Sequence, residues 1–432
     1  MFISDALSVN ENGVLTVGGC DAVKLAEQYS TPLYVIDETQ VRKNCCVYKD
    51  AFDKLYNSDG LILYSSKAFL TKEICRTIHS EGLGIDVVSG GELYTALSAG
   101  FPADKIYFHG NYKNDAEIKL AVENGIRCIT VDNEADLYNI NRIASHMNKT
   151  VRISLRLKPG VDAHTHKAIT TGHKDSKFGI DIESGEAFEI LCKVLKMPNI
   201  KLIGVHCHIG SQIFEYSPFE NSAIIMLNFI KKVKEETGYV IGELNLGGGY
   251  GVKYTNDNDK VPFGTYIEAI SKKVKEFCRD NNMDMPFILM EPGRSIVADA
   301  GITLYKVGCI KDIENIRKYI IVDGSMTDNP RYALYGSKYE CVIASKPLAK
   351  GQEVVTIAGR TCESGDIIIK DYMMPEIKEG DILAVLVTGA YNYSMSSNYN
   401  RLPRPAVVMT NNGVSRVIVK AETYEDIIRN DI

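Results

Sequence analysis

The sequence lacks any apolar run long enough to span a bilayer. None of its 432 residues belongs to a stretch of the roughly 20 apolar residues that a membrane helix needs, and the N-terminus lacks the hydrophobic segment of a secretory signal peptide. It also lacks an excess of positive charge, because the formal net charge is −6, which argues against a general nucleic-acid binder. We therefore expect a cytoplasmic protein that binds small molecules, with no nucleic acid and no membrane as partner.

The cysteines lack the spacing of a zinc knuckle or of a disulfide framework. The chain has 11 cysteines, an odd number, and none of them forms a C-x-x-C pair. Most of them are therefore expected to be small core residues in a reducing compartment. Low-complexity tracts are absent as well, and 45% hydrophobic with 24% charged residues is the composition of an ordinary globular protein.

What the sequence does contain is a repeated alternation of short apolar runs with polar, helix-length segments. Eight such runs are the pattern of a (β/α)8 barrel, whose active site forms at the C-terminal ends of the strands. They cover residues 61–67, 83–89, 105–110, 127–133, 151–157, 202–209, 243–249 and 286–293. Their ends carry a set of residues that suggests a Schiff-base cofactor. These residues are Lys67, Asp86, His109, His206, His208, three consecutive glycines and Glu291.

The character of the chain changes after about residue 300. Short β-branched segments separated by turn residues predict an all-β second domain, either a sandwich or a barrel. Residues 1–35 contain two weak strand patterns around a short helix, and we expect them to join the β domain because domain termini often lie close together. The predicted organisation is an N-terminal segment at 1–35, a (β/α)8 barrel at 36–300 and a C-terminal β domain at 301–432.

Three of the strand ends suggest how a cofactor would be held. Lys67 would be largely desolvated if it faced inward, and hence a better imine-forming nucleophile, although a lone lysine there more often snorkels or forms a salt bridge. The glycines at 247–249 follow the seventh run, where barrels often bind phosphate, although a tight turn alone is about as common. Glu291 can hold a ring nitrogen protonated, with Arg294 as an anion contact, unless the two form only a structural pair.

Two histidines, His206 and His208, share one face of a predicted strand. They suggest either a metal site or an aromatic ring lying flat against a planar cofactor. A third ligand with diagnostic spacing is missing, so the second interpretation is favoured and no metal is predicted. His164, His166 and His173 would be ligands in principle, but their polar loop favours a solvated role.

Taken together, these residues resemble the fold-type III pyridoxal-phosphate decarboxylases. The resemblance extends from Pro32 to Pro405. It depends on the joint presence and order of motifs at 64–68, 86–93, 176–180, 206–212, 247–251, 291–294, 331–335, 362–366 and 389–400. Two positions depart from the family pattern: Ser325 stands where a second glycine is expected, and Arg360 with Thr361 replaces a more usual lysine–cysteine or proline–cysteine.

The resemblance implies pyridoxal 5′-phosphate as the cofactor, a homodimer with shared active sites, and a role for each residue. Lys67 and Cys362 would be catalytic, the first binding the cofactor as an imine and the second donating a proton. The implied cofactor-binding residues are Lys67, Asp86, His208, Ser211, Gly248, Gly249, Glu291, Gly293, Arg294 and Tyr391. The implied substrate-binding residues are Arg294, Arg331, Tyr335, Glu363 and Tyr391.

The implied activity is decarboxylation of meso-2,6-diaminopimelate to L-lysine and CO2, the last step of lysine biosynthesis. The alternative is a related basic amino-acid decarboxylase acting on ornithine, arginine or carboxynorspermidine. Arg331 and Glu363 together supply both charges that a zwitterionic tail needs, which favours diaminopimelate. A catalytically inactive regulator would not need Lys67 and Cys362, and an alanine racemase would prefer arginine to Glu291.

Overall fold

The computed structural model describes residues 2–56, 59–161, 176–259 and 261–432. Contacts divide the chain into two compact units. The barrel unit comprises Cys45–Gly251 and Val261–Ser295, and the β unit comprises Met1–Asn44, Val252–Lys260 and Ile296–Ile432. The domain limits predicted from the sequence stay a prediction. No helix among the described residues is both long and apolar enough to cross a membrane.

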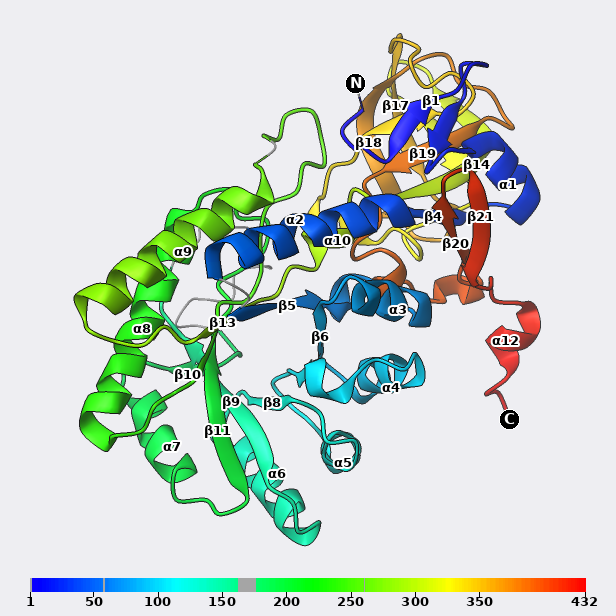
Figure 1. The fold of residues 1–432 in the computed structure, drawn as a ribbon. Helices are drawn as coiled ribbons and strands as arrows, with labels where there is room; N and C mark the ends of the chain where they lie inside the picture. The colour runs from blue at the N-terminus through cyan, green and yellow to red at the C-terminus, as the bar shows by residue number, and fades with distance from the viewer. Residues whose placement is uncertain (1, 57–58, 162–175, 260) are drawn as a thin grey trace. The chain divides into compact units, whose positions relative to one another are not determined.

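A closed barrel of parallel strands forms the centre of the barrel unit (Figure 1). Its strands are β5 (Gly60–Ser65), β6 (Gly84–Val87), β7 (Ile106–Phe108), β8 (Cys128–Val131), β9 (Val151–Lys158), β11 (Ile200–His206), β12 (Glu243–Asn245) and β13 (Phe287–Met290). Each strand pairs with the next, and β13 returns to β5. The short strand β10 (Ile180–Asp181) adds to β9. The predicted (β/α)8 barrel is thereby confirmed.

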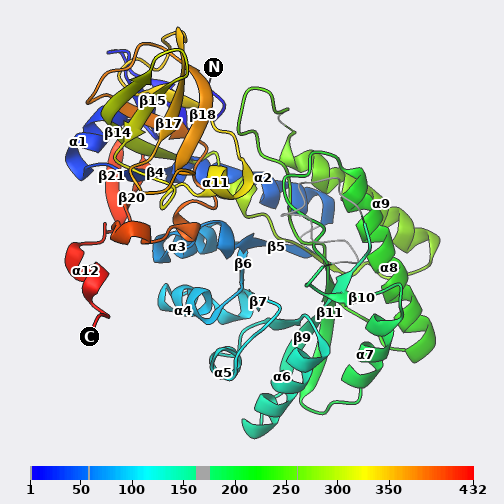
Figure 2. The ribbon, with the colours of Figure 1, turned by 180° about the vertical axis from the view of Figure 1, so that it is seen from behind.

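Helices follow the strands in sequence and lie around the outside of the barrel (Figures 1 and 2). They are α3 (Lys72–Ser80), α4 (Gly90–Ser98), α5 (Asp115–Glu123), α6 (Glu134–His146), α7 (Glu186–Val194), α8 (Ser217–Thr237) and α9 (Phe263–Asp280). Side-chain caps define where several of them begin, because the oxygens of Thr71, Ser89, Asn114 and Asn133 accept backbone N–H groups of the first turn. Each cap ends a loop that leads out of a strand and fixes the geometry next to the strand ends.

The β unit contains a mostly antiparallel sheet. Its strands are β4 (Leu33–Asp37), β14 (Gly301–Ile313), β15 (Arg317–Val322), β16 (Cys341–Ile343), β17 (Glu353–Ala358), β18 (Ile367–Met374), β19 (Ile382–Leu386), β20 (Ala406–Asn411) and β21 (Val414–Val419). Their order is β18-β17-β15-β14-β4-β20-β21, with β19 pairing with both β14 and β16. This sheet confirms the predicted all-β second domain.

The N-terminal part of the chain contributes to this unit at two places. Strands β1 (Leu7–Val9), β2 (Leu15–Val17) and β3 (Cys20–Asp21) form a small sheet of their own, which α1 (Ala22–Tyr29) follows. Strand β4 then lies inside the large sheet, antiparallel to β14 and parallel to β20. The short helices α10 (Arg294–Val297), α11 (Arg331–Tyr335) and α12 (Tyr424–Ile428) complete the C-terminal part of the chain.

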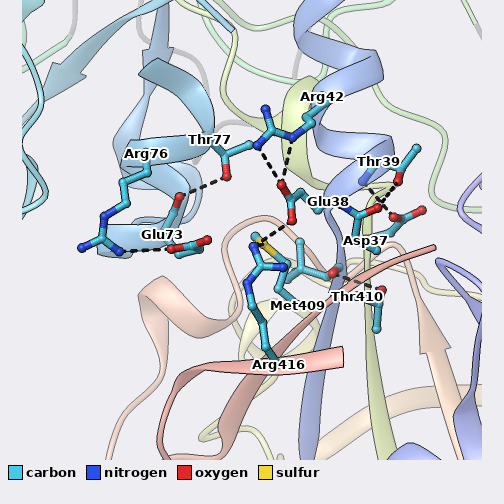
Figure 3. Close-up of polar contacts among 12 residues, drawn as sticks. Asp37, Glu38, Thr39, Arg42, Glu73, Arg76, Thr77, Met409, Thr410 and Arg416 are labelled. Carbon is cyan, nitrogen blue, oxygen red and sulfur yellow. Dashed lines mark hydrogen bonds and ion pairs between the residues drawn. The ribbon is translucent and has the colours of Figure 1, made fainter. Parts of the chain in front are cut away.

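A buried carboxylate at the start of α2 (Glu38–Tyr56), directly after β4, binds an arginine of the edge strand β21 (Figure 3). Glu38, the first residue of α2, accepts hydrogen bonds from Arg42 Nε at 2.9 Å and from Arg416 Nη2 at 2.7 Å. Burial opposes the charge, but the two guanidinium groups hold the pKa of Glu38 below its usual value. The cluster thus joins residues that are far apart in the sequence.

Candidate active site

Lys67 directly follows β5, in the short 3-10 helix η1 (Ser66–Ala68). The turn is held by Tyr64, whose hydroxyl donates a hydrogen bond of 2.6 Å to the carbonyl of Phe69. Ser66 and Ala68 are buried, whereas the side chain of Lys67 is exposed. The expectation that Lys67 is largely desolvated is therefore wrong for the chain alone, because this turn buries the two neighbours of Lys67 and leaves its own side chain exposed.

The carboxylate of Glu291, at the end of β13, is the centre of a buried polar cluster in the barrel unit. Its oxygens lie 2.9 Å from His109 Nε2 and 3.2 Å from His206 Nε2, and Asn245 Nδ2 donates to it at 2.7 Å. Burial alone would raise the pKa of Glu291, but favourable electrostatic contacts with His109 and His206 hold that pKa well below its usual range. Glu291 is therefore ionised although it is buried.

The two histidines of the β11 end have different environments. Burial lowers the pKa of His206 to about 4, although the neighbouring Glu291 opposes the shift, so this ring is neutral near pH 7. His208 is half-buried, and burial together with the charge of Lys67 puts its pKa well below the usual value. Its Nδ1 accepts a long hydrogen bond, 3.4 Å, from the backbone N–H of Gly248. A neutral, flat ring thus lies directly against the glycine turn.

The nitrogens of His109 and His206 and an oxygen of Glu291 all lie within 4.8 Å of one another, which is a spacing that a metal ion would accept. His206 Nε2 is already in a hydrogen bond with a Glu291 oxygen at 3.2 Å. The three further histidines considered from the sequence, His164, His166 and His173, lie outside the described residues.

Asp86, the third residue of β6, is a buried acid in the same unit. Burial and the charge of Glu291 raise its pKa to about 7, while His109 and Lys67 oppose the shift. The two carboxyls therefore differ in charge near neutral pH, since Glu291 holds its negative charge and Asp86 holds a proton for much of the time.

The glycine turn after β12 leaves no room for side chains. A Cβ on Gly248 would lie 2.0 Å from the carbonyl oxygen of Glu291, and one on Gly249 would lie 2.2 Å from that of Gly210. Gly247 and Gly249 also have φ of +66° and +120°, which favour glycine. The turn therefore brings bare backbone close to the end of β13, as an anion-binding turn requires.

A cation lies next to this turn. Arg294 Nη2 donates a hydrogen bond of 3.0 Å to the hydroxyl of Ser211, and both residues follow barrel strands. Gly293, which precedes the arginine, is equally crowded, because a Cβ there would lie 2.8 Å from Cβ of Ser65. The structure thus brings the predicted barrel residues together at the C-terminal ends of the strands.

A second set of predicted residues lies in the β unit around Arg331, the first residue of α11. Its guanidinium is buried, lies over the ring of Tyr254 at 4.8 Å and donates from Nη1 to the hydroxyl of Tyr339 at 3.0 Å. Burial disfavours its charge, but these tyrosines more than compensate and raise the pKa of Arg331. No carboxylate of the described residues lies within ion-pair distance of it.

The other predicted residues of the β unit lie on loops and a helix end. Cys362 and Glu363 are adjacent and exposed, between β17 and β18. Tyr335 ends α11 and is half-buried. Tyr391 is half-buried, has a φ of +59° and contributes to the electrostatic environment of Arg331. Arg331 and Tyr391 are thus brought together within this unit.

Asn245, Tyr254 and Tyr339 carry none of the roles that the sequence motifs predict. Asn245 ends β12 directly before the glycine turn, so its position at a strand end was a signal that would have found it. The two tyrosines carried no such signal, because they belong to segments separated by more than 80 residues and meet only in the folded chain. His109 lies at a strand end, as the sequence predicts, and its contact with Glu291 makes it part of the cluster.

A parallel barrel with a lysine, a glycine turn and an ionised buried glutamate at its strand ends is the architecture of a cofactor-dependent enzyme. Residues 38–298 match the family described as "Pyridoxal-dependent decarboxylase, pyridoxal binding domain". The chain therefore belongs to the pyridoxal-dependent decarboxylases.

Several relatives that are 38–49% identical to this chain share one name. Diaminopimelate decarboxylase of Bacillus methanolicus is 49% identical over 97% of both chains, and that of Bacillus subtilis is 46% identical over 100% of this chain and 98% of the relative. The crystal structure of diaminopimelate decarboxylase from M. jannaschii in complex with L-lysine superposes with a TM-score of 0.94 at 37% identity, covering 100% of this chain and 99% of the other.

The barrel unit fits pyridoxal phosphate. A carboxylate that stays ionised when buried, as Glu291 does, can hold a proton on a pyridine nitrogen. The crowded turn at Gly248 and Gly249 and the guanidinium of Arg294 suit a phosphate. The residues present therefore match both the ring and the anion of the cofactor.

Proposed function

We propose that this chain decarboxylates meso-2,6-diaminopimelate to L-lysine and CO2, the last step of lysine biosynthesis. The observation that carries the proposal is the buried guanidinium of Arg331, which has no carboxylate partner among the described residues. A buried cation needs an anion, and the carboxylate at the non-reacting end of diaminopimelate supplies one. The names of the similar proteins support the same substrate.

We assign the barrel residues to the cofactor. Lys67 binds its carbonyl carbon, His208 lies against its ring, and Glu291 keeps the ring nitrogen protonated. Asp86 adds a second acid beside this charge, and the phosphate is held by Ser211, Gly248, Gly249, Gly293, Arg294 and Tyr391. Pyridoxal phosphate, when bound, accepts the electron pair that departing CO2 leaves at Cα.

We assign the loops of the β unit to the substrate and to the proton. Arg331, with Arg294, Tyr335 and Tyr391, binds the carboxylate that stays, and Glu363 binds the far ammonium group. The thiol of Cys362 delivers the proton that replaces CO2 at Cα. Because a planar guanidinium matches a carboxylate at two points, it also rejects a substrate that lacks this group.

The proposal includes a homodimer with shared sites and a cytoplasmic location. Because Cys362 and Glu363 are exposed on the chain alone, each is accessible to a second copy. Mixing inactive Lys67→Ala subunits with inactive Cys362→Ala subunits should restore part of the activity if each site takes residues from both copies. Verified subunit exchange without any recovery would contradict shared sites.

The test of the reaction is direct. The purified chain is mixed with pyridoxal phosphate and, separately, with meso-diaminopimelate, L-lysine, L-ornithine and L-arginine, and CO2 release is measured together with the amine product. We expect L-lysine and CO2 from meso-diaminopimelate, with kcat/KM higher by roughly a thousandfold than for substrates without the distal carboxylate. A preference for ornithine or arginine would replace this proposal with the basic amino-acid decarboxylase alternative.

A further inference from the structure

The segment that carries Cys362 is fastened at its base by the buried carboxylate of Asp366, which is 3% exposed. Asp366 Oδ2 accepts the backbone N–H of Thr361 at 2.8 Å and also the Thr361 hydroxyl. Asp366 Oδ1 accepts the backbone N–H of Met326 at 2.6 Å. One side chain thus ties two separate loops of the β unit together through three donors.

The tip between these anchors is the exposed part of the loop. All four residues from 362 to 365 are exposed, whereas Asp366, Ile368 and Ile369 are buried. The turn is closed by the N–H of Asp366, which donates to the carbonyl of Glu363 at 3.0 Å. Gly359 packs directly against Asp366, because a Cβ on this glycine would lie 2.4 Å from the Asp366 carboxylate. The part of the loop around Asp366 is therefore tightly packed, while residues 362–365 are accessible to solvent.

A third contact reaches Cys362 itself. Its backbone N–H donates a hydrogen bond of 2.8 Å to Oδ1 of Asn400. Asn400 has a φ of +52°, a conformation that asparagine tolerates better than most residues, and it ends the polar run that begins at Gly389. The residue carrying the thiol is thus held on one side by Asn400 and on the other by the Thr361–Asp366 pair.

Both departures from the family pattern lie at this junction. Thr361 supplies a hydroxyl to Asp366, and Ser325, fully buried in the facing loop, donates its N–H to Asp328 at 2.9 Å. Ser325 also shares a hydrogen bond of 2.6 Å with the hydroxyl of Thr327. At the two positions where this sequence departs from the family pattern, the hydroxyl of Thr361 therefore bonds the carboxylate that joins the loops, and the hydroxyl of Ser325 bonds within its own loop.

We propose that Thr361, Asp366 and Asn400 are positioning residues that set the place of the Cys362 thiol during proton delivery. The inference rests on the proposed function, because it takes Cys362 as the proton donor. A displacement of about 1 Å of a reacting group is enough to cost on the order of a hundredfold in rate. A loop that is exposed at its tip needs such anchors to keep the thiol in one position.

The test compares variants that differ by one polar group. Thr361→Val removes the hydroxyl at nearly constant volume, and Thr361→Ser restores it. Asn400→Ala removes the acceptor, and Asn400→Asp keeps an oxygen there. Ser364→Ala, at the exposed tip, is the control. The measurements are kcat and KM for meso-diaminopimelate, the visible absorbance of bound pyridoxal phosphate, and hydrogen exchange of the peptide spanning 359–366.

We expect Thr361→Val and Asn400→Ala to lower kcat by about tenfold with KM within about twofold, because proton delivery follows substrate binding. Cofactor absorbance should stay as in the wild type, and the 359–366 peptide should exchange faster. Thr361→Ser and Asn400→Asp should recover most of the rate, and Ser364→Ala should change nothing.

Two results would overturn the inference. One is a wild type that is active while Thr361→Val and Asn400→Ala match it in kcat. The other is unchanged exchange of the 359–366 peptide in both variants. A wild type that does not act on diaminopimelate at all contradicts the proposed function instead, and the exchange measurement then still decides whether these residues hold the loop.

Discussion

Two buried charges in this molecule are handled in opposite ways. Glu291, in the barrel unit, is surrounded by donors of its own chain: two histidine nitrogens and one asparagine amide within 3.2 Å. Arg331, in the β unit, has two tyrosine rings and a hydroxyl around it, but no carboxylate of the described residues. The charge of Glu291 has its hydrogen-bond partners within the protein, whereas the charge of Arg331 lacks a counter-ion among the described residues and can bind an anion.

The comparison shows how burial can serve two purposes. Glu291 is fixed in one ionisation state before any cofactor arrives, so its charge is a property of the fold. The charge of Arg331 is supported by aromatic faces and one hydroxyl, which are weaker partners than a carboxylate. Replacing each charge should therefore affect stability and activity in different proportions.

The largest expected effect comes from Arg331→Met, which keeps the length of the side chain and removes its charge. We expect kcat/KM for meso-diaminopimelate to fall by roughly a thousandfold, because the distal carboxylate would be buried without a partner. The melting temperature should stay the same or rise, since no protein carboxylate loses a partner. Arg317→Met, which removes an arginine paired with Asp371 at 2.7 Å, is the control and should leave kcat/KM within about twofold of the wild type. A large loss of stability in Arg331→Met would show that the charge of Arg331, like that of Glu291, contributes to the stability of the fold.

A smaller loss of activity, but a larger loss of stability, is expected from Glu291→Gln. The amide cannot keep a ring nitrogen protonated, so kcat should fall on the order of a hundredfold. Two histidines and Asn245 would also lose a charged acceptor, which should lower the melting temperature by roughly 5 °C. Thermal unfolding of the protein without added cofactor separates the two effects. Equal stability of wild type and variant would show that Glu291 is not the centre of a stabilising cluster.

Tyr339→Phe should have a moderate effect. It removes the hydroxyl that accepts from Arg331 Nη1 and keeps the ring. We expect kcat/KM for meso-diaminopimelate to fall by about tenfold, mostly through KM, because the guanidinium loses an orienting contact. Tyr319→Phe, a change on strand β15 of the large sheet, is the matched control. If both variants behave like the wild type, the tyrosines support the arginine only by packing.

The smallest effect concerns pH, and it belongs to the barrel unit alone. Folded His206 has a pKa of about 4, whereas an unfolded histidine titrates near about 6.5. Between these values the unfolded chain binds more protons, so the free energy of unfolding falls as the pH is lowered, by on the order of 1 kcal/mol per pH unit for this residue. Asp86 has a raised pKa in the folded state, so its contribution to the free energy of unfolding increases as the pH is lowered. The slope should therefore be taken as the difference between wild type and His206→Gln in denaturant titrations, with exposed His79→Gln as the control. Identical slopes in all three proteins would contradict a neutral, buried His206.

Much of the barrel site was predictable from the sequence, because most of its polar residues lie at or near the ends of the strands. Lys67, Glu291 and the glycine turn stand at the ends of apolar runs and Asp86 lies within one, so the order of the runs predicted that they share one edge of the barrel. The β strands from residue 301 onward were predictable for a similar reason, since β-branched segments alternate with turn residues there.

The rest depended on contacts that no local pattern records. Tyr254 follows the seventh barrel strand in the sequence, yet Val252–Lys260 groups with the β unit, where its ring supports Arg331. The exposure of Lys67 depends on how η1 packs Ser66 and Ala68, which an apolar run does not reveal. The junction at Asp366 likewise joins loops whose sequences give no sign of each other.

The pairing of β4 with β20 has a consequence for the order in which the molecule is made. Leu33 is next to Ala406 in the sheet, so β4 leaves the ribosome about 370 residues before its parallel neighbour. At roughly 5–20 residues per second, that delay lasts on the order of 20–70 s. The whole barrel unit, which ends at Ser295, is synthesised within this interval. A nascent chain therefore carries Leu33–Ile36 without its β20 neighbour for most of its synthesis, and an unpaired strand edge of this kind is prone to wrong pairing until residues 406–410 emerge.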